Sequence, residues 1–392
     1  MPRESATPSA GEAAARPAAR VAPGAVATDA GPAAAEAAPV AGSAGGAGSA
    51  GGAAARPLAR RRRRLLAGFA IAVAVLLVVA VLSLMVGART IASADVLHAL
   101  LHYSRSDADA LVVVDSRLPR TLLGVVAGVG LGLAGTVMQG LSRNPLADPG
   151  ILGVNFGASL AVVVAIALLG VTTPSGYLWF AFAGAALASA LVYAVSSLGR
   201  EGATPVKLAI AGAAVSAALG SLITAVQLIS PASLDAMRFW QVGSLAGRGF
   251  GVLWQVLPTL ALGAALALAL GRLLNGLALG DDVARGLGQR VGATRVLCGV
   301  AIVLLCGSAT AAVGPIAFLG LIVPHIARRV VGADYRWILA YSAIVAPALL
   351  LACDILGRVV ARPGELQVGV VLAFVGAPVF IALVRRRKLV SL

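Results

Sequence analysis

The sequence predicts an all-α polytopic membrane protein with about ten transmembrane helices, and its composition and hydropathy carry this prediction. Of the 392 residues, 59% are hydrophobic and 12% are charged, whereas an ordinary soluble domain carries about 25% charged residues. Long apolar runs follow one another from residue 65 almost to the C-terminus, and a run of about 20 apolar residues can cross a bilayer as a helix. Most of the chain is therefore expected to lie in a membrane.

The N-terminal segment, residues 1–59, differs from the rest of the chain. It is rich in Ala, Gly, Pro and Ser and contains no aromatic residue, so it cannot bury a core and is predicted to be a disordered cytoplasmic tail. The transmembrane domain, residues 60–388, follows it. Five arginines at 60–64 precede the first apolar run, which begins too late for a cleaved signal peptide. These arginines should hold the start of the run in the cytoplasm.

Ten spans are expected, with approximate limits of 65–87, 117–141, 151–170, 176–199, 205–229, 251–273, 293–312, 316–331, 336–358 and 366–385. With the N-terminus inside, the cytoplasmic flanks and loops carry more than twice as many Lys and Arg residues as the external ones. Because positive charge is enriched in short cytoplasmic loops, both termini are predicted to be cytoplasmic.

Two external segments join predicted spans. In 88–116, His98 and His102 are four residues apart and would share one face of a helix, where they could bind a metal or haem iron. The simpler interpretation is an amphipathic helix at the membrane interface over residues 96–103. In 230–250, Phe239 and Trp240 are predicted to anchor the loop at the membrane interface.

Several kinds of chemistry are missing from the sequence. A net charge of +15 could indicate a nucleic-acid partner, but most arginines lie at the ends of apolar runs, where they set membrane orientation. The two lysines, Lys207 and Lys388, lie outside any GxxxxGK[ST] motif, so the chain is not expected to hydrolyse ATP. Cys298, Cys306 and Cys353 lack CxxC spacing and are predicted to be small core residues. No catalytic residue, metal site or cofactor is predicted.

Asp354 is the only acidic residue placed within a predicted span. It lies four residues before Arg358, so a local helical ion pair near the outer surface is the default interpretation. A single carboxylate without a second partner in the membrane makes a poor proton path, which disfavours the alternative of an ion-coupled secondary transporter. A membrane enzyme is disfavoured further, because no arrangement of nucleophile and base is visible.

The most informative stretch is 117–159, which reads RLPRTLLGVVAGVGLGLAGTVMQGLSRNPLADPGILGVNFGAS. Its glycines allow a neighbouring helix to approach closely in lipid. The ordered motifs RLPRT, GTVMQG and NPLADPGILGV closely resemble the permease subunits of binding-protein-dependent ABC importers for iron-siderophores, haem and cobalamin, the FecCD or BtuC-like family. Two later stretches, GPIAFLGLIVPHIARRVVGADYRW and CDILGRVVARPGELQVGVVLAFVGAPVF, match the same family, so the resemblance covers roughly residues 65–387.

This resemblance implies a BtuC-like type II ABC importer permease in the bacterial cytoplasmic membrane. It also implies the partners: two ATP-binding subunits, a second permease subunit that is a copy or a paralogue, and an extracytoplasmic substrate-binding protein. ATP would be bound by the ATPase subunits. The translocation path would lie at the interface of the two permeases and be lined largely by span 205–229, whose Ala, Gly and Ser residues leave room for a bulky ligand.

The cytoplasmic connection 280–292, GDDVARGLGQRVG, is predicted to form two short helical pieces joined by a bend, because its glycines would break a longer helix. An ordinary amphipathic loop is the alternative, but the string resembles the family's coupling helices, which dock into a cleft of each ATPase subunit. The residues assigned to this docking are Asp281, Asp282, Val283, Ala284, Arg285, Gly286, Leu287, Gly288, Val291 and Gly292.

Three arginines are predicted to face the same external side. Arg117 and Arg120 stand at the outer start of one span, and Arg358 stands at the outer end of another. In the family, arginines at the matching positions meet glutamates of the substrate-binding protein, and bidentate pairing would orient the partner as well as attract it. Simple anchoring at the interface is the alternative role.

The cargo is expected to be a ferric siderophore, because the string RFWQVGSLAGR in 230–250 looks most like that of ferric-siderophore permeases. Haem and cobalamin are the alternatives within the family. Haem binding by His98 and His102 would reverse this order.

Overall fold

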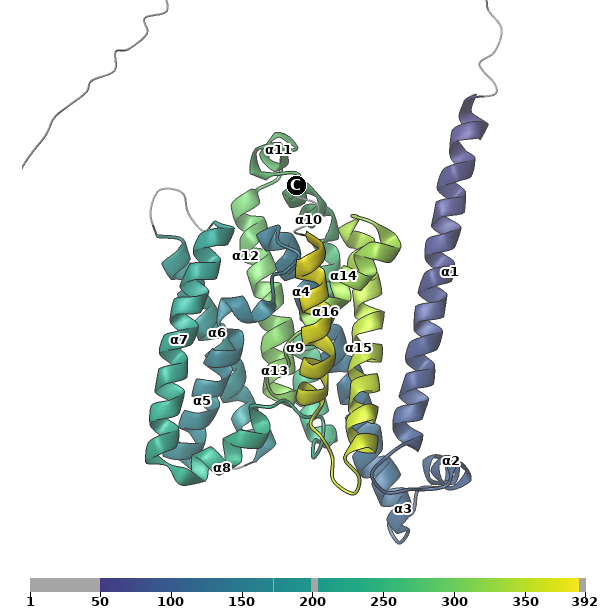
Figure 1. Cartoon of the computed structure of the whole chain (residues 1–392), viewed down its shortest axis with the longest axis vertical. Helices are drawn as coiled ribbons and strands as arrows, with labels where there is room; N and C mark the ends of the chain where they lie inside the picture. The colour runs from purple at the N-terminus through teal and green to yellow at the C-terminus, as the bar shows by residue number, and fades with distance from the viewer. Residues whose placement is uncertain (1–49, 172, 199–203, 388–392) are drawn as a thin grey trace, which may run out of the picture. The chain divides into compact units, whose positions relative to one another are not determined.

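The computed structural model describes residues 50–171, 173–198 and 204–387. The chain divides between Ala54 and Ala55, and the fold described below belongs to the second unit, Ala55–Leu392. The predicted N-terminal tail, 1–59, lies mostly outside the described residues. Residues 50–59, which belong to the predicted disordered tail, are helical. Every regular element of the described residues is a helix, and the predicted all-α class is confirmed (Figure 1).

Ten helices correspond to the ten predicted spans. They are α1 (Ala50–Met85), α4 (Leu118–Ser142), α5 (Val154–Leu169), α6 (Pro174–Ser196), α7 (Pro205–Ile229), α9 (Phe250–Ala269), α12 (Val291–Ile302), α14 (Leu319–Val331), α15 (Tyr335–Val360) and α16 (Val368–Arg387). Shorter elements connect or extend them: α2 (Ser93–Leu101), α3 (Ala108–Leu111), η1 (Val112–Arg117), η2 (Pro149–Leu152), α8 (Pro231–Trp240), α10 (Gly271–Ala278), α11 (Asp281–Gly286), η3 (Val303–Gly307) and α13 (Ser308–Val313).

Seven helical stretches of the described residues are long and apolar enough to cross a membrane. The helices of 154–169 and 368–382 are apolar but shorter. The predicted span 316–331 is shorter still, because residues 314–318 are not helical and α14 begins at Leu319. A non-helical backbone at this depth is tolerated only where protein or water surrounds it.

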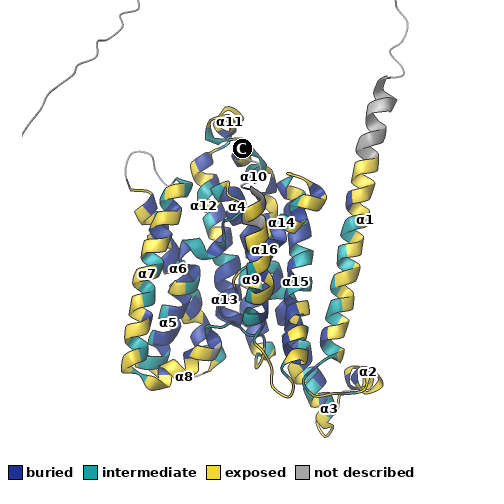
Figure 2. Ribbon diagram, in the orientation of Figure 1, coloured by how far each residue is buried: buried dark blue, intermediate teal, exposed yellow. Residues whose placement is uncertain are grey.

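Helix α4 is the buried centre of the bundle (Figure 2). It packs most extensively against α15 and also contacts α14, α9 and α12. The predicted use of glycine is visible at the contacts: a Cβ atom on Gly128 would meet the backbone of Pro347 in α15, and one on Gly135 would meet the backbone of Gly320 in α14. Gln139 donates to the carbonyl of Leu321 at 3.1 Å, one turn beyond this crossing. Two backbones therefore touch where no side chain intervenes, as expected for helix packing in lipid.

Helices α5, α6 and α7 form a second packed group. Gly157 of α5 and Gly184 of α6 face each other so closely that a Cβ atom on either would meet the other's carbonyl oxygen. Helix α7 packs against both neighbours but leaves much of its surface exposed. The exposed surface of α7 is therefore available for a second protein or a cargo.

Candidate functional site

The three arginines predicted to meet the binding protein gather beside the C-terminal end of α1. Arg117 ends η1, Arg120 lies in the first turn of α4 and Arg358 lies in the last turn of α15. The residues are 4%, 8% and 1% exposed, respectively. Their common location agrees with the prediction, but each guanidinium group is bound inside the chain.

Arg117 and Arg358 cap the C-terminal end of α1. The last carbonyl groups of a helix have no partner within it, and a positive charge there complements the helix dipole. Nη1 of each arginine donates to two such carbonyl oxygens at 2.8–2.9 Å. The acceptors are Leu84 and Met85 for Arg117, and Ser83 and Val86 for Arg358.

Asp354 joins the other two arginines. Arg120 donates to both carboxylate oxygens, through Nε at 3.1 Å and Nη2 at 2.8 Å. Nη2 of Arg358 lies 2.6 Å from Oδ2 of the same carboxylate. The predicted local pair of Asp354 and Arg358 therefore exists, but an arginine from another helix shares it.

Glu365 completes the cluster and was missed by reasoning from the sequence. Its carboxylate accepts from Nη1 of Arg120 at 2.7 Å, and its side chain is 31% exposed. The signal that could have found it is its place: Glu365 is the acidic residue of the connection between α15 and α16, beside the predicted external arginines. These four residues, Arg120, Asp354, Arg358 and Glu365, are called the ion cluster below.

A contact between Arg117, Arg120 or Arg358 and an external protein stays a prediction. Such a contact requires the three guanidinium groups to give up hydrogen bonds to acceptors within this chain and to form new ones with carboxylates of the partner. Arg89 and Arg362 lie beside the same end of α1 and are exposed. Arg89 pairs with Asp109 at 2.8 Å, and Arg362 donates to the carbonyl of Gly87 at 2.9 Å.

The predicted docking segment, 280–292, projects at the opposite end of the bundle (Figure 1). Its first piece is α11, and the predicted bend follows, with Gly288 at a φ of 80° before α12 begins at Val291. Val283 and Leu287 are 49% and 70% exposed and lie one helical turn apart. Exposed apolar residues at this spacing form a small hydrophobic surface that suits a protein groove.

Asp281 ties this segment to the bundle. Its carboxylate pairs with Arg143, which follows α4, and with Arg295 of α12 at 2.7 Å.

The other predicted docking residues differ in exposure. Asp282, the next residue, has a side chain that is 98% exposed and pairs with Arg285 at 2.8 Å. Ala284 is fully buried, while Gly286, Gly288 and Gly292 are exposed. The exposed apolar side chains of the segment therefore lie on and directly after a short helix that ion pairs attach to α12 and to the end of α4.

A cavity with a mixed apolar and polar lining, called the polar cavity below, lies between α5, α7 and the non-helical residues before α14. Its volume is about 540 Å³. The lining residues are Asn155, Phe156, Ser159, Gly220, Ile223, Thr224, Gln227, Gln241 and Pro315. Amide and hydroxyl groups dominate the polar part of this lining, so the cavity suits a polar, uncharged or chelated cargo. Span 205–229 was predicted to line the translocation path, and its helix α7 supplies Gly220, Ile223, Thr224 and Gln227 to this cavity.

Small residues continue along the exposed surface of α7. Ala209, Ala213, Ala217 and Ser221 are spaced by four residues and are all exposed. Residues at this spacing share one face of a helix. The face is continuous with the polar cavity through Gly220 and Thr224.

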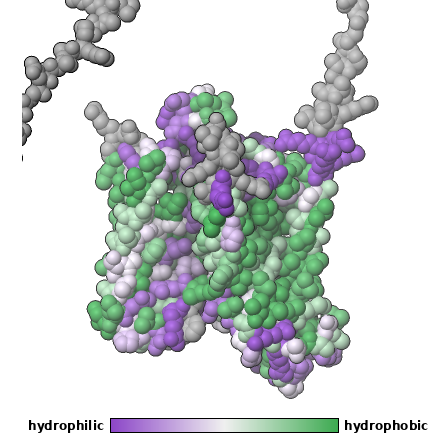
Figure 3. Space-filling view, viewed as in Figure 1, coloured by the Kyte–Doolittle hydropathy of each residue, from purple (hydrophilic) through white to green (hydrophobic). Residues whose placement is uncertain are grey.

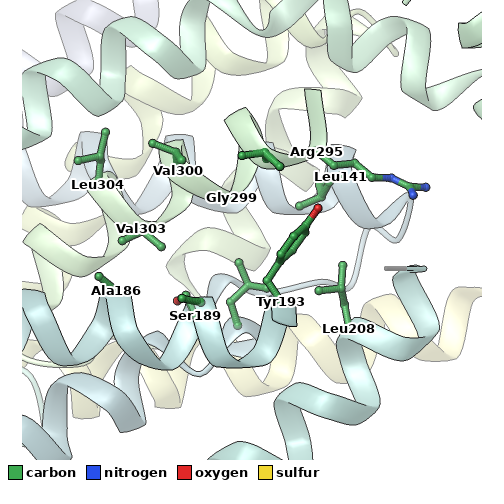
Figure 4. A pocket seen from close by; sticks show the side chains of 13 residues that line it. Leu141, Ala186, Ser189, Tyr193, Leu208, Arg295, Gly299, Val300, Val303 and Leu304 are labelled. Carbon is green, nitrogen blue, oxygen red and sulfur yellow. The ribbon is translucent and has the colours of Figure 1, made fainter. Parts of the chain in front are cut away.

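A second cavity, of about 340 Å³, lies between α6 and α12 (Figure 4). Its lining is almost entirely apolar, as Val300, Val303 and Leu304 illustrate. Arg295 borders it, but its guanidinium group points away from the cavity in Figure 4 and binds Asp281. An apolar cavity of this kind does not suit a polar chelate.

His98 and His102 lie exposed at the end of α2, where their rings stack with centroids 4.9 Å apart. Val96 and Ala99 are buried on the same helix, as the amphipathic interpretation expects. Within the described residues, no group of three or more His, Cys, Asp and Glu side chains is placed to hold a metal. The three cysteines are buried, in agreement with a core role.

The predicted anchoring role of Trp240 is wrong. Its residue is 3% exposed and its ring packs edge-on against Tyr177, with centroids 6.4 Å apart. Helix α8 directs the indole into the bundle instead of the membrane interface. The side chain of Phe239 lies outside the described residues.

Comparison with known proteins matches this chain to a family model. Residues 75–386 match the FecCD transport family. The chain is 51% identical over 312 residues to the ferric enterobactin transport system permease protein FepD of Escherichia coli (strain K12), covering 80% of this chain and 93% of FepD. It is 41% identical over 307 residues to the Fe(3+)-citrate import system permease protein YfmD of Bacillus subtilis (strain 168), covering 78% and 91%.

A solved structure agrees with the sequence match. A protein described as a metal-chelate type ABC transporter in an inward-facing conformation superposes with a TM-score of 0.70 at 28% identity, covering 83% of this chain and 99% of that one. The fold, the motifs and the relatives thus point to one assignment. This chain is a membrane permease that belongs to the FecCD transport family.

Proposed function

We propose that this chain is the permease subunit of an ABC importer that carries ferric siderophores across the bacterial cytoplasmic membrane. The observation that carries the proposal is the 51% identity to a ferric enterobactin permease over 80% of the chain. The polar cavity beside α7 is consistent with a hydrophilic chelate as cargo. Haem and cobalamin remain the alternatives, and an ion-coupled secondary transporter is a weaker one.

The ATP-binding partners are proposed to dock on the segment 280–292. Val283 and Leu287 offer the apolar contact, and Asp281 transmits force from this contact to α12 and to the end of α4 through Arg295 and Arg143. This arrangement supports a mechanical link between ATPase closure and helix movement. Both termini are proposed to lie on the same, cytoplasmic side, in accord with the distribution of arginines.

A second permease, either a copy of this chain or a paralogue, is proposed to face α7. The exposed row of small residues on α7 would leave a space between two such helices, and the polar cavity opens onto this row. The path would then be bounded by both permeases.

The substrate-binding protein is proposed to dock at the end of the bundle where α1 ends. Arg117, Arg120 and Arg358 are the predicted contacts, and they are joined there by the exposed Arg89 and Arg362. Cations on this surface would attract partner carboxylates. Charge reversal at Arg89 and Arg362 tests attraction without breaking the ion cluster. Arg117→Glu tests the predicted contact but also removes a cap of α1, so its effect on stability is measured beside its effect on docking.

The deciding experiment is uptake of radiolabelled iron, supplied as several ferric siderophores, in cells with and without this gene, beside labelled haem and cobalamin. Loss of siderophore uptake alone is the expected result. Loss of only haem or cobalamin uptake would contradict the proposed ferric-siderophore cargo. Uptake that persists without any ATPase partner would contradict the proposed ABC mechanism.

A further inference from the structure

We infer that the arginine-rich start of α1 and the start of α15 together form a binding site for the headgroup of an anionic phospholipid. A cavity of about 270 Å³ lies between these two elements. It is lined by Arg61, Arg62, Leu65, Asp334, Arg336 and Trp337. This site lies outside the transport path and the docking surfaces proposed above.

The charge of the cavity favours an anion. Asp334 is the acidic group in the lining, and its carboxylate is already engaged by Arg336 at 3.0 Å and by the amide of Asn275 at 2.8 Å. In the described part of the chain, Arg61 and Arg62 form no ion pair within 4 Å. Arg61 donates weakly to the carbonyl of Val331 at 3.4 Å, which directs it across the gap toward the end of α14. Two cationic side chains therefore remain for a ligand, and phosphate is an oxyanion that arginine binds well.

The position of the cavity, at the boundary between the charged and the apolar part of α1, indicates that the ligand is a lipid. Leu65 starts the apolar run of α1 directly after the five arginines at 60–64, so the cavity lies where charged and apolar surfaces meet. Figure 3 shows hydrophilic residues at this end of α1 above a hydrophobic surface. Trp337 adds the amphipathic ring that is enriched at headgroup level. Basic pockets between membrane helices on the cytoplasmic side are typical sites for anionic headgroups.

The sparse packing of α1 against the bundle suggests what a bound lipid would do: it would attach α1 to α15. The membrane-spanning part of α1 is exposed along its apolar length, including Ile71 at 65% and Leu77 at 61%. Near the cavity it touches α15 through Tyr341, whose hydroxyl donates to the carbonyl of Leu65 at 2.6 Å and whose ring meets Phe69 edge-on. A headgroup held by α1 and α15 together, with acyl chains along the exposed surface of α1, would fasten the first span to the bundle.

The test uses the purified full-length chain and native mass spectrometry after limited delipidation. Phosphatidylglycerol and cardiolipin are titrated against phosphatidylcholine, with wild type, Arg61→Ala/Arg62→Ala and the matched control Arg60→Ala/Arg63→Ala. The control removes the same charge from the same helix but from outside the cavity lining. We expect one tightly retained anionic lipid per chain in wild type and control, with at least ten-fold lower occupancy in Arg61→Ala/Arg62→Ala.

Equal losses in both double variants would overturn the site, because general surface charge would then explain the binding. Displacement of the lipid by millimolar inorganic phosphate would instead assign the cavity to a free anion.

A second experiment, fluorescence quenching, does not depend on the arginine variants. Phosphatidylglycerol brominated high on its acyl chains should quench a fluorescence component that disappears in Trp337→Phe, and unchanged quenching in that variant would contradict the proposal.

Discussion

Arg120 and Asp354 stand 234 residues apart in the sequence and form two parallel hydrogen bonds, at 3.1 and 2.8 Å, between α4 and α15. Both side chains are nearly inaccessible, at 10% and 1% exposure. A bidentate arginine–carboxylate pair fixes orientation as well as distance. The pair therefore sets how the two most extensively packed helices of the bundle meet.

Removing one member of this pair should destabilise the fold strongly. Arg120→Ala leaves the buried Asp354 carboxylate with Arg358 alone, and Asp354→Ala leaves two buried arginines without their shared carboxylate. Breaking a buried ion pair in this way costs about 3–5 kcal/mol. Thermal unfolding of the detergent-solubilised chain measures the loss. Glu365→Gln is the matched control, because Glu365 is partly exposed and should lose less than about 1 kcal/mol. Equal effects in the three variants would contradict this account of the ion cluster.

A methyl group at Gly135 should separate α4 from α14. A Cβ atom there would meet the carbonyl and Cα of Gly320, which are backbone atoms and cannot rotate away. Gly135→Ala is expected to lower the melting temperature and the yield of folded protein. Gly299→Ala in α12 is the control, since open space surrounds that position and alanine favours a helix by about 1 kcal/mol relative to glycine. A Gly135→Ala protein as stable as Gly299→Ala would show that the two backbones are not in contact.

Charged residues on the apolar surface formed by Val283 and Leu287 should weaken recruitment of the proposed ATPase subunit without unfolding the permease. Val283→Glu/Leu287→Glu places carboxylates on side chains that are already exposed, so the melting temperature should stay unchanged. We expect at least a ten-fold loss of ATPase recruitment, measured by co-purification of the ATPase subunit with the permease. Asp282→Ala alters an exposed neighbour on the same helix and should retain recruitment. Full recruitment of the ATPase subunit by the double variant would contradict the assignment of docking to residues 280–292.

The N-terminal cap of α15 gives a prediction about pH. Hydrogen bonds from Arg336 lower the pKa of Asp334 to about 2, assisted by Asn275 and opposed by partial burial. A carboxyl group with a lowered pKa contributes stability above its unfolded pKa, and this contribution is lost as the pH falls from about 4 through 2. Asp334→Ala should therefore cost about 1 kcal/mol, as for other helix caps, and the same amount at pH 5 and at pH 8. Unfolding curves at the two pH values check this, and a cost that halves at pH 5 would contradict it.

The sequence was sufficient to locate the helices because lipid imposes one rule on every span. A run of apolar residues must satisfy its own backbone hydrogen bonds and therefore becomes a helix. Helices α1 and α7 show this, since their C-terminal ends, at Met85 and Ile229, lie within two residues of the predicted limits. The start of α1, at Ala50, lies earlier than the predicted start of its apolar run at Leu65. The break before α14 depends instead on packing around residues 314–318, which hydropathy does not describe.

The roles of individual side chains were harder to predict, because they depend on partners that are distant in the sequence. Arg117 reads as an external cation, yet its acceptors are carbonyl groups that any residue could supply. Trp240 reads as an interface anchor, yet the direction of α8 buries it. The local structure of the predicted docking segment 280–292 was easier to predict, because its glycines and acidic residues act locally on the helix and the bend.

The capping of α1 by Arg358 has a consequence for how the protein is made. The carbonyl of Ser83 and the guanidinium group of Arg358 are 275 residues apart, and chains are synthesised at about 5–20 residues per second, so roughly 14–55 seconds separate their appearance. During synthesis Arg117 can cap the C-terminal end of α1 early, but the carbonyl groups of Ser83 and Val86 have no guanidinium partner until α15 is made. The packing of α1 is therefore completed late in synthesis, and truncation after α14 would leave Arg117 without Arg358 as the second cap at the C-terminal end of α1.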